Sequence, residues 1–214
     1  MIVQKAIRGV GGITKAKADD AFRFGILCNW WNKVSTMPEI EVYQRLTERN
    51  LYWHQNRYND PDPQEGGEDF YKHSPFISTT AGSIERDPSA GLNILHPAWL
   101  VALEFATDGW TRDAYLFYCY LFVIGKRSVP HRPFSEELRE LNVYTGFSAF
   151  QPEGEIAAKI NIPPTQIEKY AFYPIAGIRQ DLASGRIPAP AQEVLNQITY
   201  RSPEEVSNIR DFLS

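Results

Sequence analysis

The sequence predicts an α+β protein, because helix-like and strand-like segments occupy separate parts of the chain. The pattern is helical from about residue 16 to residue 56, strand-like from Phe76 to Tyr173, and helical again from Pro190 onward. Such segregation is typical of α+β folds, whereas strict alternation would predict a parallel α/β sheet. No repeat with a period of about 20–50 residues is visible, and no linker divides the chain. We therefore expect a single domain over residues 1–214.

The N-terminal part is expected to begin with a strand and continue as a helix. Ile2–Arg8 forms a short β-prone run, and the glycines at 9, 11 and 12 are expected to end it. Phe22, Ile26 and Trp30 recur at i, i+4 and i+8, which predicts one face of a helix.

A second helix and a polar loop follow. Ser35 or Thr36 can cap this helix with Pro38 in its first turn, and its buried side would carry Val42, Leu46 and Leu51. The segment Asn59–Asp69 has no apolar residue other than proline and glycine. We expect it to be a surface loop or a lid beside a site.

The second half is expected to supply most of the strands and the last helix. A Ser-Pro-Glu-Glu sequence at residues 202–205 predicts the start of that helix. The expected strands are Phe76–Thr79, Trp99–Ala106, Tyr115–Ile124, Glu155–Ile162 and Tyr170–Tyr173.

Composition narrows the classes of function. The net charge of −4 lacks the basic excess that phosphate neutralisation gives to most duplex-nucleic-acid binders. Two cysteines without a CxxC motif and four scattered histidines do not predict a zinc site. The most apolar run, Ala114–Gly125, is too short to span a bilayer, and no signal-peptide-like stretch opens the chain. We expect a soluble protein without a bound metal.

Three short motifs carry residues suited to chemistry. Arg8 ends the first strand, Phe76–Thr80 ends in hydroxyl residues, and Glu153 and Glu155 flank Gly154 at the start of a later strand. Each motif alone is common on protein surfaces. Their combination in this order is what predicts a function.

The combination resembles the arginine–serine–glutamate class of mono-ADP-ribosyltransferases, which includes cholera-toxin-like, clostridial, scabin and pierisin toxins. The segment EGEIAAKINIPPTQI also resembles this family's strand after the catalytic glutamate. The resemblance implies an ADP-ribosyltransferase-like split β-sandwich with N-terminal helices around an NAD cleft. It also implies NAD⁺ as co-substrate and a role as a toxin or effector.

The roles of the matched residues follow from the chemistry of NAD⁺. The planar fork of Arg8 suits a bidentate phosphate contact. A carboxylate at Glu155 can stabilise the oxocarbenium charge that develops on the ribose, and a Ser78 hydroxyl can hold that carboxylate by a hydrogen bond. The resemblance places further cofactor contacts at Gly9, Thr79, Thr80 and Arg86, the last as a second phosphate contact.

The acceptor is expected to be a protein arginine side chain. In the resembled family a Glu-x-Glu pair accompanies arginine acceptors, and strand alternation puts Glu153 on the same face as Glu155. Phe147 and Phe150 precede the pair and would dock the acceptor, unless both rings belong to the core. Residues 126–142 look like an insertion, which extends the site or binds a partner.

Several alternatives stay open from the sequence. These are ADP-ribosylation of a nucleic acid or nucleotide, plain NAD⁺ hydrolysis, an NAD-binding module without turnover, and an aromatic-rich structural domain. The acidic balance and Glu153 count against nucleic acid. A secreted or translocated effector acting in a target-cell cytosol would need an immunity or inhibitor protein where it is made, and no membrane partner is expected.

Overall fold

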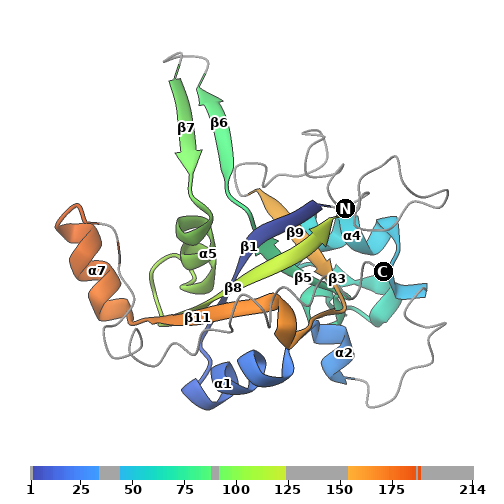
Figure 1. Ribbon diagram of the computed structural model, residues 1–214. Helices are drawn as coiled ribbons and strands as arrows, with labels where there is room; N and C mark the ends of the chain where they lie inside the picture. Colours follow the sequence, from blue (N-terminus) through green and yellow to red (C-terminus); the bar gives the residue numbers. More distant parts are fainter. Residues whose placement is uncertain (1, 34–43, 88–91, 124–153, 187, 189–214) are drawn as a thin grey trace.

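The computed structural model describes residues 2–33, 44–87, 92–123, 154–186 and 188. Its centre is an antiparallel sheet with strand order β11-β8-β1-β5-β9 (Figure 1). These strands are β1 (Ile2–Gly11), β5 (Phe76–Thr80), β8 (Ala114–Val123), β9 (Glu155–Lys159) and β11 (Ile167–Tyr173). Together with the helices around it, this sheet confirms the α+β class.

Helices and short strand pairs surround the sheet. The helices are α1 (Lys15–Phe24), α2 (Asn29–Lys33), α4 (Glu48–Asn56), α5 (Ala98–Ala106) and α7 (Ile175–Ala183). The smaller pairs are β2 (Ile26–Leu27) with β10 (Asn161–Ile162), β3 (Pro61–Asp62) with β4 (Glu68–Asp69), and β6 (Ser83–Asp87) with β7 (Leu92–His96). Short 3-10 turns are η1 (Pro63–Glu65), η2 (Phe70–His73) and η4 (Pro164–Gln166). Within the described ranges, every helix is too short or too polar to traverse a bilayer.

The sheet is covered on both faces by different helices. Along β8, Tyr115, Phe117 and Cys119 face a core that includes α1 and Trp30, while Leu116 faces a core that includes α5 and α7. This alternation follows from the two-residue period of a strand. Figure 1 shows α5 and α7 on one side of the sheet and α1 on the other.

The sheet opens between β1 and β5. β1 pairs with β8 along its whole length, and β5 pairs with β9 from Phe76 to Thr80. Between β1 and β5, by contrast, the register contains only Ile7 with Thr80. The two halves of the sheet are therefore joined at one pair and diverge beyond it.

Glycines allow β1 to continue beyond Arg8, so the prediction that they end the strand is wrong. The strand runs to Gly11, which pairs with Ala114. A Cβ on Gly9 would lie 2.2 Å from the Ala102 carbonyl oxygen, and one on Gly11 would lie 1.7 Å from that of Ala106. The glycines are thus needed because α5 packs directly on the β1 backbone.

The single helix predicted from Phe22, Ile26 and Trp30 is also wrong. Thr14 caps α1, but the helix ends at Gly25, whose φ of 97° is in the left-handed region. Ile26 then pairs with Ile162 in β2, and Trp30 lies in α2. The three side chains still lie in one core. Their spacing in the sequence therefore indicates that they are buried, but not that they belong to one continuous helix.

The predicted strand Trp99–Ala106 is the helix α5. An apolar run of this length is ambiguous, because buried helices and buried strands share it. In the structure this segment is helical, and Ala102 and Ala106 lie one turn apart on the face that packs against the glycines of β1. The strands predicted at Phe76–Thr79 and Tyr170–Tyr173 are confirmed, and so is the one at Tyr115–Ile124 as far as Val123, the last described residue there. The one predicted at Glu155–Ile162 bends at Ile160 (φ 56°) to form β9 and β10.

The loop Asn59–Asp69 is held against α4 and the residues just before it by two arginine–carboxylate contacts. Asp62 is 1% exposed and accepts hydrogen bonds from Arg49, at 2.6 Å and 3.2 Å, and from the Gln64 backbone N–H at 2.9 Å. Arg45 also forms an ion pair with Glu65. Burial acts to raise the pKa of Asp62, but the bonds from Arg49 and Gln64 outweigh it and hold that pKa below its usual value.

Other predicted features lie outside the described residues. They are the helix cap at Ser35 or Thr36, Pro38, Val42, the segment 126–142 and the helix from Pro190 onward.

Gly11→Ala is expected to destabilise the protein by about 2–3 kcal/mol, because the new methyl group overlaps α5 backbone. Gly177→Ala is the matched control, since its Cβ would lie 3.5 Å from Pro174 Cγ, within a helix that favours alanine. Urea unfolding measures both. Equal stabilities for the two variants would contradict the close contact between α5 and β1.

Asp62→Asn is expected to lower the free energy of unfolding by about 2–3 kcal/mol at pH 7, because it removes the ionised partner of Arg49. Since the folded-state pKa of Asp62 is depressed, the wild-type advantage exists above the unfolded pKa of about 4 and shrinks as pH falls through the lower folded value. Urea unfolding at several pH values from about 7 down to 3 tests this. Asp60→Asn, at an exposed pair, is the control, and a pH-independent difference for Asp62→Asn would refute the ionic role.

Candidate active site

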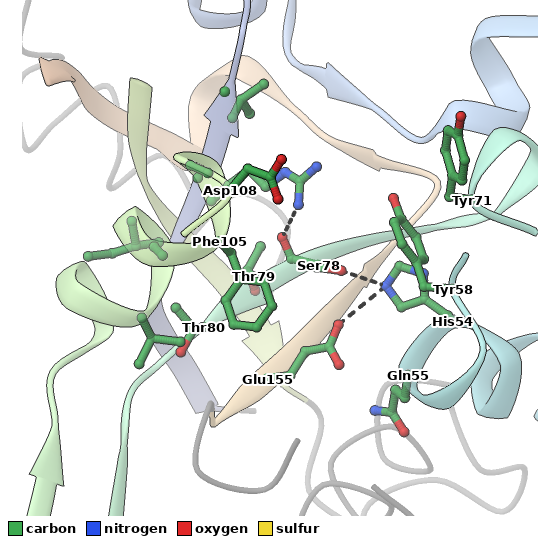
Figure 2. Close-up of a pocket in the computed structure, with 18 of the residues that line it drawn as sticks. His54, Gln55, Tyr58, Tyr71, Ser78, Thr79, Thr80, Phe105, Asp108 and Glu155 are labelled. Carbon is green, nitrogen blue, oxygen red and sulfur yellow. Dashed lines mark hydrogen bonds and ion pairs between the residues drawn. The ribbon is translucent and has the colours of Figure 1, made fainter. Parts of the chain in front are cut away.

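A cavity of about 670 Å³ lies where the sheet opens. Its walls come from β1 (residues 7–11), the end of α4, β5, the C-terminal part of α5 and the first residue of β9. This volume is typical of small-molecule sites, which are commonly a few hundred to about 1,000 Å³. Figure 2 shows the polar side chains that converge in it.

Arg8 bridges the opening of the sheet. It follows Ile7, the residue at the single β1–β5 pair, and its Nη1 donates to the Ser78 backbone oxygen at 2.9 Å. That contact uses one of the five guanidinium N–H donors. The buried Nε has no hydrogen-bond partner in the described residues. The guanidinium is therefore held in place while retaining donors for a ligand.

His54 stands between Ser78 and Glu155. Its Nε2 lies 2.9 Å from the Ser78 hydroxyl and 3.3 Å from Glu155 Oε1 (Figure 2). His54 is 3% exposed and Glu155 is 8% exposed. The sequence predicts a direct bond from Ser78 to Glu155, and the structure instead joins them through the imidazole ring.

The hydrogen bonds around His54 favour one tautomer of its ring. The buried Ser74 hydroxyl oxygen lies 2.7 Å from Nδ1 and accepts from the Phe76 backbone N–H at 3.2 Å. The Ser74 hydroxyl can then donate its proton to His54 Nδ1, which leaves the ring proton on Nε2. In this tautomer the imidazole N–H points towards Ser78 and Glu155.

Helix α4 determines where the imidazole lies. The Thr47 hydroxyl caps the helix by accepting from the Asn50 N–H at 3.1 Å, and Leu51 packs against Phe76 and Ala157. His54 is three residues after Leu51 and so shares its buried face. That spacing is visible in the sequence, but nothing in the sequence shows that this face meets Ser78. His73 packs against Asp62, with its Nε2 3.5 Å from Oδ2, and does not line the cavity.

The neighbouring threonines fix β5 against β9. The Thr79 hydroxyl donates to the Ile156 backbone oxygen, and that of Thr80 accepts from the Gly82 N–H at 3.0 Å. Gly154 has φ 55°, and a Cβ there would lie 2.1 Å from the Gly82 oxygen, so the chain needs glycine before Glu155. Both threonines also line the cavity.

The structure brings Arg8, Gly9, Ser78, Thr79, Thr80 and Glu155 to one cavity. Of the other predicted site residues, Glu153, Phe147 and Phe150 lie outside the described residues. Arg86 is in β6, but its side chain is also outside the described part.

Tyrosines form a wall that the sequence did not reveal. Tyr58 and Tyr71 line the cavity with ring centroids 5.9 Å apart, and the Asn29 amide donates to the Tyr71 backbone oxygen at 2.7 Å. Burial raises the pKa of Tyr58, which Arg8 partly opposes, so its hydroxyl is neutral at physiological pH. Across the described residues, no three His, Cys, Asp or Glu side chains gather as metal ligands do.

Comparison with known proteins gives a distant structural likeness. No protein-family model matches the sequence, and no curated protein does. The fold is similar to that of a heat-labile enterotoxin double mutant, with a TM-score of 0.37 and 18% identity. The match covers 79% of this chain and 57% of the enterotoxin chain.

Ser74→Ala is expected to remove the partner of His54 Nδ1 and to destabilise the fold by about 1–3 kcal/mol. It should also increase the population of the Nδ1–H tautomer, which ¹⁵N NMR of the imidazole nitrogens measures directly. Ser184→Ala, whose hydroxyl bonds the exposed end of α7, is the control. An unchanged tautomer in Ser74→Ala would disprove the proton assignment.

Proposed function

We propose that this protein is an NAD⁺-dependent mono-ADP-ribosyltransferase. The observation that carries the proposal is the convergence of Arg8, Ser78 and Glu155, which come from three separate motifs, in one cavity. They are linked within it by the Arg8–Ser78 and Ser78–His54–Glu155 contacts. A structural domain would not need a buried carboxylate, an imidazole and a guanidinium around an open cavity, because each is costly to desolvate.

Arg8 would hold the pyrophosphate of NAD⁺. Its guanidinium is positioned by the Ser78 carbonyl group and keeps N–H donors for phosphate oxygens. An arginine fork suits this bidentate contact better than the point charge of lysine. The contact would place the nicotinamide ribose at a fixed distance from Arg8, along the direction of Ser78 and Glu155.

Glu155 would stabilise the charge that develops as nicotinamide departs. The bond between C1′ of the ribose and the nicotinamide nitrogen breaks, and its electron pair leaves with neutral nicotinamide. Positive charge then builds on the ribosyl C1′ and ring oxygen. A nearby carboxylate in a largely buried cavity stabilises that charge strongly. The His54 N–H and the Ser78 hydroxyl would act as positioning groups that hold the carboxylate in one orientation.

The acceptor we propose is a protein arginine side chain, bound beside Glu153 and docked by Phe147 or Phe150. The acceptor nitrogen attacks C1′ and then loses a proton, for which Glu153 would be the base. In this proposal the protein is a toxin or effector, and the cell that makes it would also make an inhibitor.

Glu155→Gln is expected to lower kcat for nicotinamide release about 100-fold or more, because it removes the charge that stabilises the ribosyl cation. Arg8→Lys is expected to raise KM for NAD⁺ about tenfold, because it removes the bidentate fork. Incubation with NAD⁺ labelled on the adenine, with and without a cell lysate, measures both nicotinamide release and transfer.

The matched controls are Glu104→Gln on the exposed side of α5 and Arg57→Lys at an exposed pair. Label on a protein band with wild type alone would support transfer to protein. Free ADP-ribose without a labelled band would indicate that the protein is an NAD⁺ glycohydrolase and not a transferase. Full activity of Glu155→Gln would overturn the assignment of the site.

A further inference from the structure

A turn after α5 forms the side of the cavity opposite His54. Phe105, Asp108 and Arg112 line this side, and Phe105 is 56% exposed. Figure 2 shows Phe105 and Asp108 on the other side of Ser78 from His54. Within the described residues, the Asp108 carboxylate takes part in no ion pair or hydrogen bond.

The backbone of this turn has an unusual, strained conformation at Asp108 and the two residues after it. Asp108, Gly109 and Trp110 have φ values of 54°, 62° and 68°, three consecutive residues in the left-handed region. Such strain persists only where the surroundings hold it, and it concentrates at functional sites.

The surroundings that hold the turn are identifiable. Buried Thr107 accepts from the Trp110 N–H at 3.0 Å and donates to the Glu104 carbonyl oxygen at 3.1 Å. Arg179 on α7 donates to the Trp110 carbonyl oxygen at 3.0 Å. Two helices and a buried hydroxyl thus hold Asp108 at the cavity.

Arg112 is held against the glycine end of β1. Its Nε donates to the Ala106 carbonyl oxygen at 3.2 Å. A Cβ on Gly11 would lie 2.7 Å from that Nε, so the space the arginine occupies exists because residue 11 is glycine. The cavity therefore has two cations from different elements, Arg8 and Arg112, and the Asp108 carboxylate also lines it.

We propose that the turn Thr107–Arg112 makes this site selective for NAD⁺ over NADP⁺. Arg112 is the second contact to the pyrophosphate, and Asp108 accepts a hydrogen bond from a hydroxyl of the adenosine ribose. A 2′-hydroxyl can donate to a carboxylate, whereas a 2′-phosphate cannot and is repelled by it. This inference rests on the proposed function, because it assumes that the ligand is a nicotinamide dinucleotide.

The test measures binding in the Glu155→Gln background, where turnover is slow. Titration calorimetry gives the Kd of NAD⁺ and of NADP⁺ with and without Asp108→Asn. NAD⁺ is expected to bind at least about tenfold more tightly than NADP⁺, and Asp108→Asn is expected to reduce that ratio about tenfold, mainly by improving NADP⁺ binding. Glu104→Gln, on α5 shortly before this turn but outside the cavity, should leave the affinity ratio unchanged.

Two further readouts separate the proposal from a general loss of structure. Arg112→Gln should weaken NAD⁺ binding about tenfold while the unfolding temperature stays near that of Glu104→Gln. Added salt should reduce the preference for NAD⁺ over NADP⁺, measured as the ratio of their Kd values, more in wild type than in Asp108→Asn. The reason is that salt screens the repulsion between carboxylate and phosphate.

The outcomes distinguish this inference from the function beneath it. If wild type consumes NAD⁺ but Asp108→Asn leaves the ratio unchanged, or if wild type binds NADP⁺ as tightly as NAD⁺, the role of Asp108 is wrong and the transferase stands. If neither dinucleotide binds to Glu155→Gln and wild type consumes neither, the proposed function fails, and the selectivity fails with it.

Discussion

The opening of the sheet beyond Ile7 and Thr80 is the constraint on which the rest of the site depends. Beyond that one pair, β1 follows β8 and β5 follows β9, so the two halves diverge. The Arg8 guanidinium bridges the opening by donating to the Ser78 carbonyl group. Close packing of α5 on the glycines of β1 holds that strand in place. A continuous sheet would fill this space with backbone hydrogen bonds and leave no cavity.

The polar groups of the cavity are positioned by independent pieces of structure. Pairing of Thr80 with Glu155 fixes the start of β9, and Gly154 allows the close approach that this start requires. The core contact of Leu51 with Phe76 and Ala157 fixes α4 and therefore His54. Because each group has its own support, the carboxylate, imidazole and hydroxyl are arranged before any ligand arrives, which is the condition for electrostatic stabilisation of a transition state.

The sequence predicted the local motifs better than it predicted the packing between elements. Arg8, Ser78 and Glu155 were identified because each belongs to a short motif within one strand, and the structure brings them together. His54 and Asp108 were missed, because their relevance depends on which helix or turn faces the cavity. α5 was predicted as a strand, since an apolar run does not reveal its partner; its alanines meet glycines more than 90 residues earlier in the chain. Glu153, Phe147 and Phe150 lie outside the described residues and stay predictions.

The most direct test of the account is a crystal structure of the Glu155→Gln protein with NAD⁺ bound. The account predicts the pyrophosphate on the Arg8 guanidinium and C1′ of the nicotinamide ribose beside residue 155, within the cavity between β1 and β5. NAD⁺ bound elsewhere, or bound here with its phosphates away from Arg8 and its nicotinamide ribose away from residue 155, would contradict it.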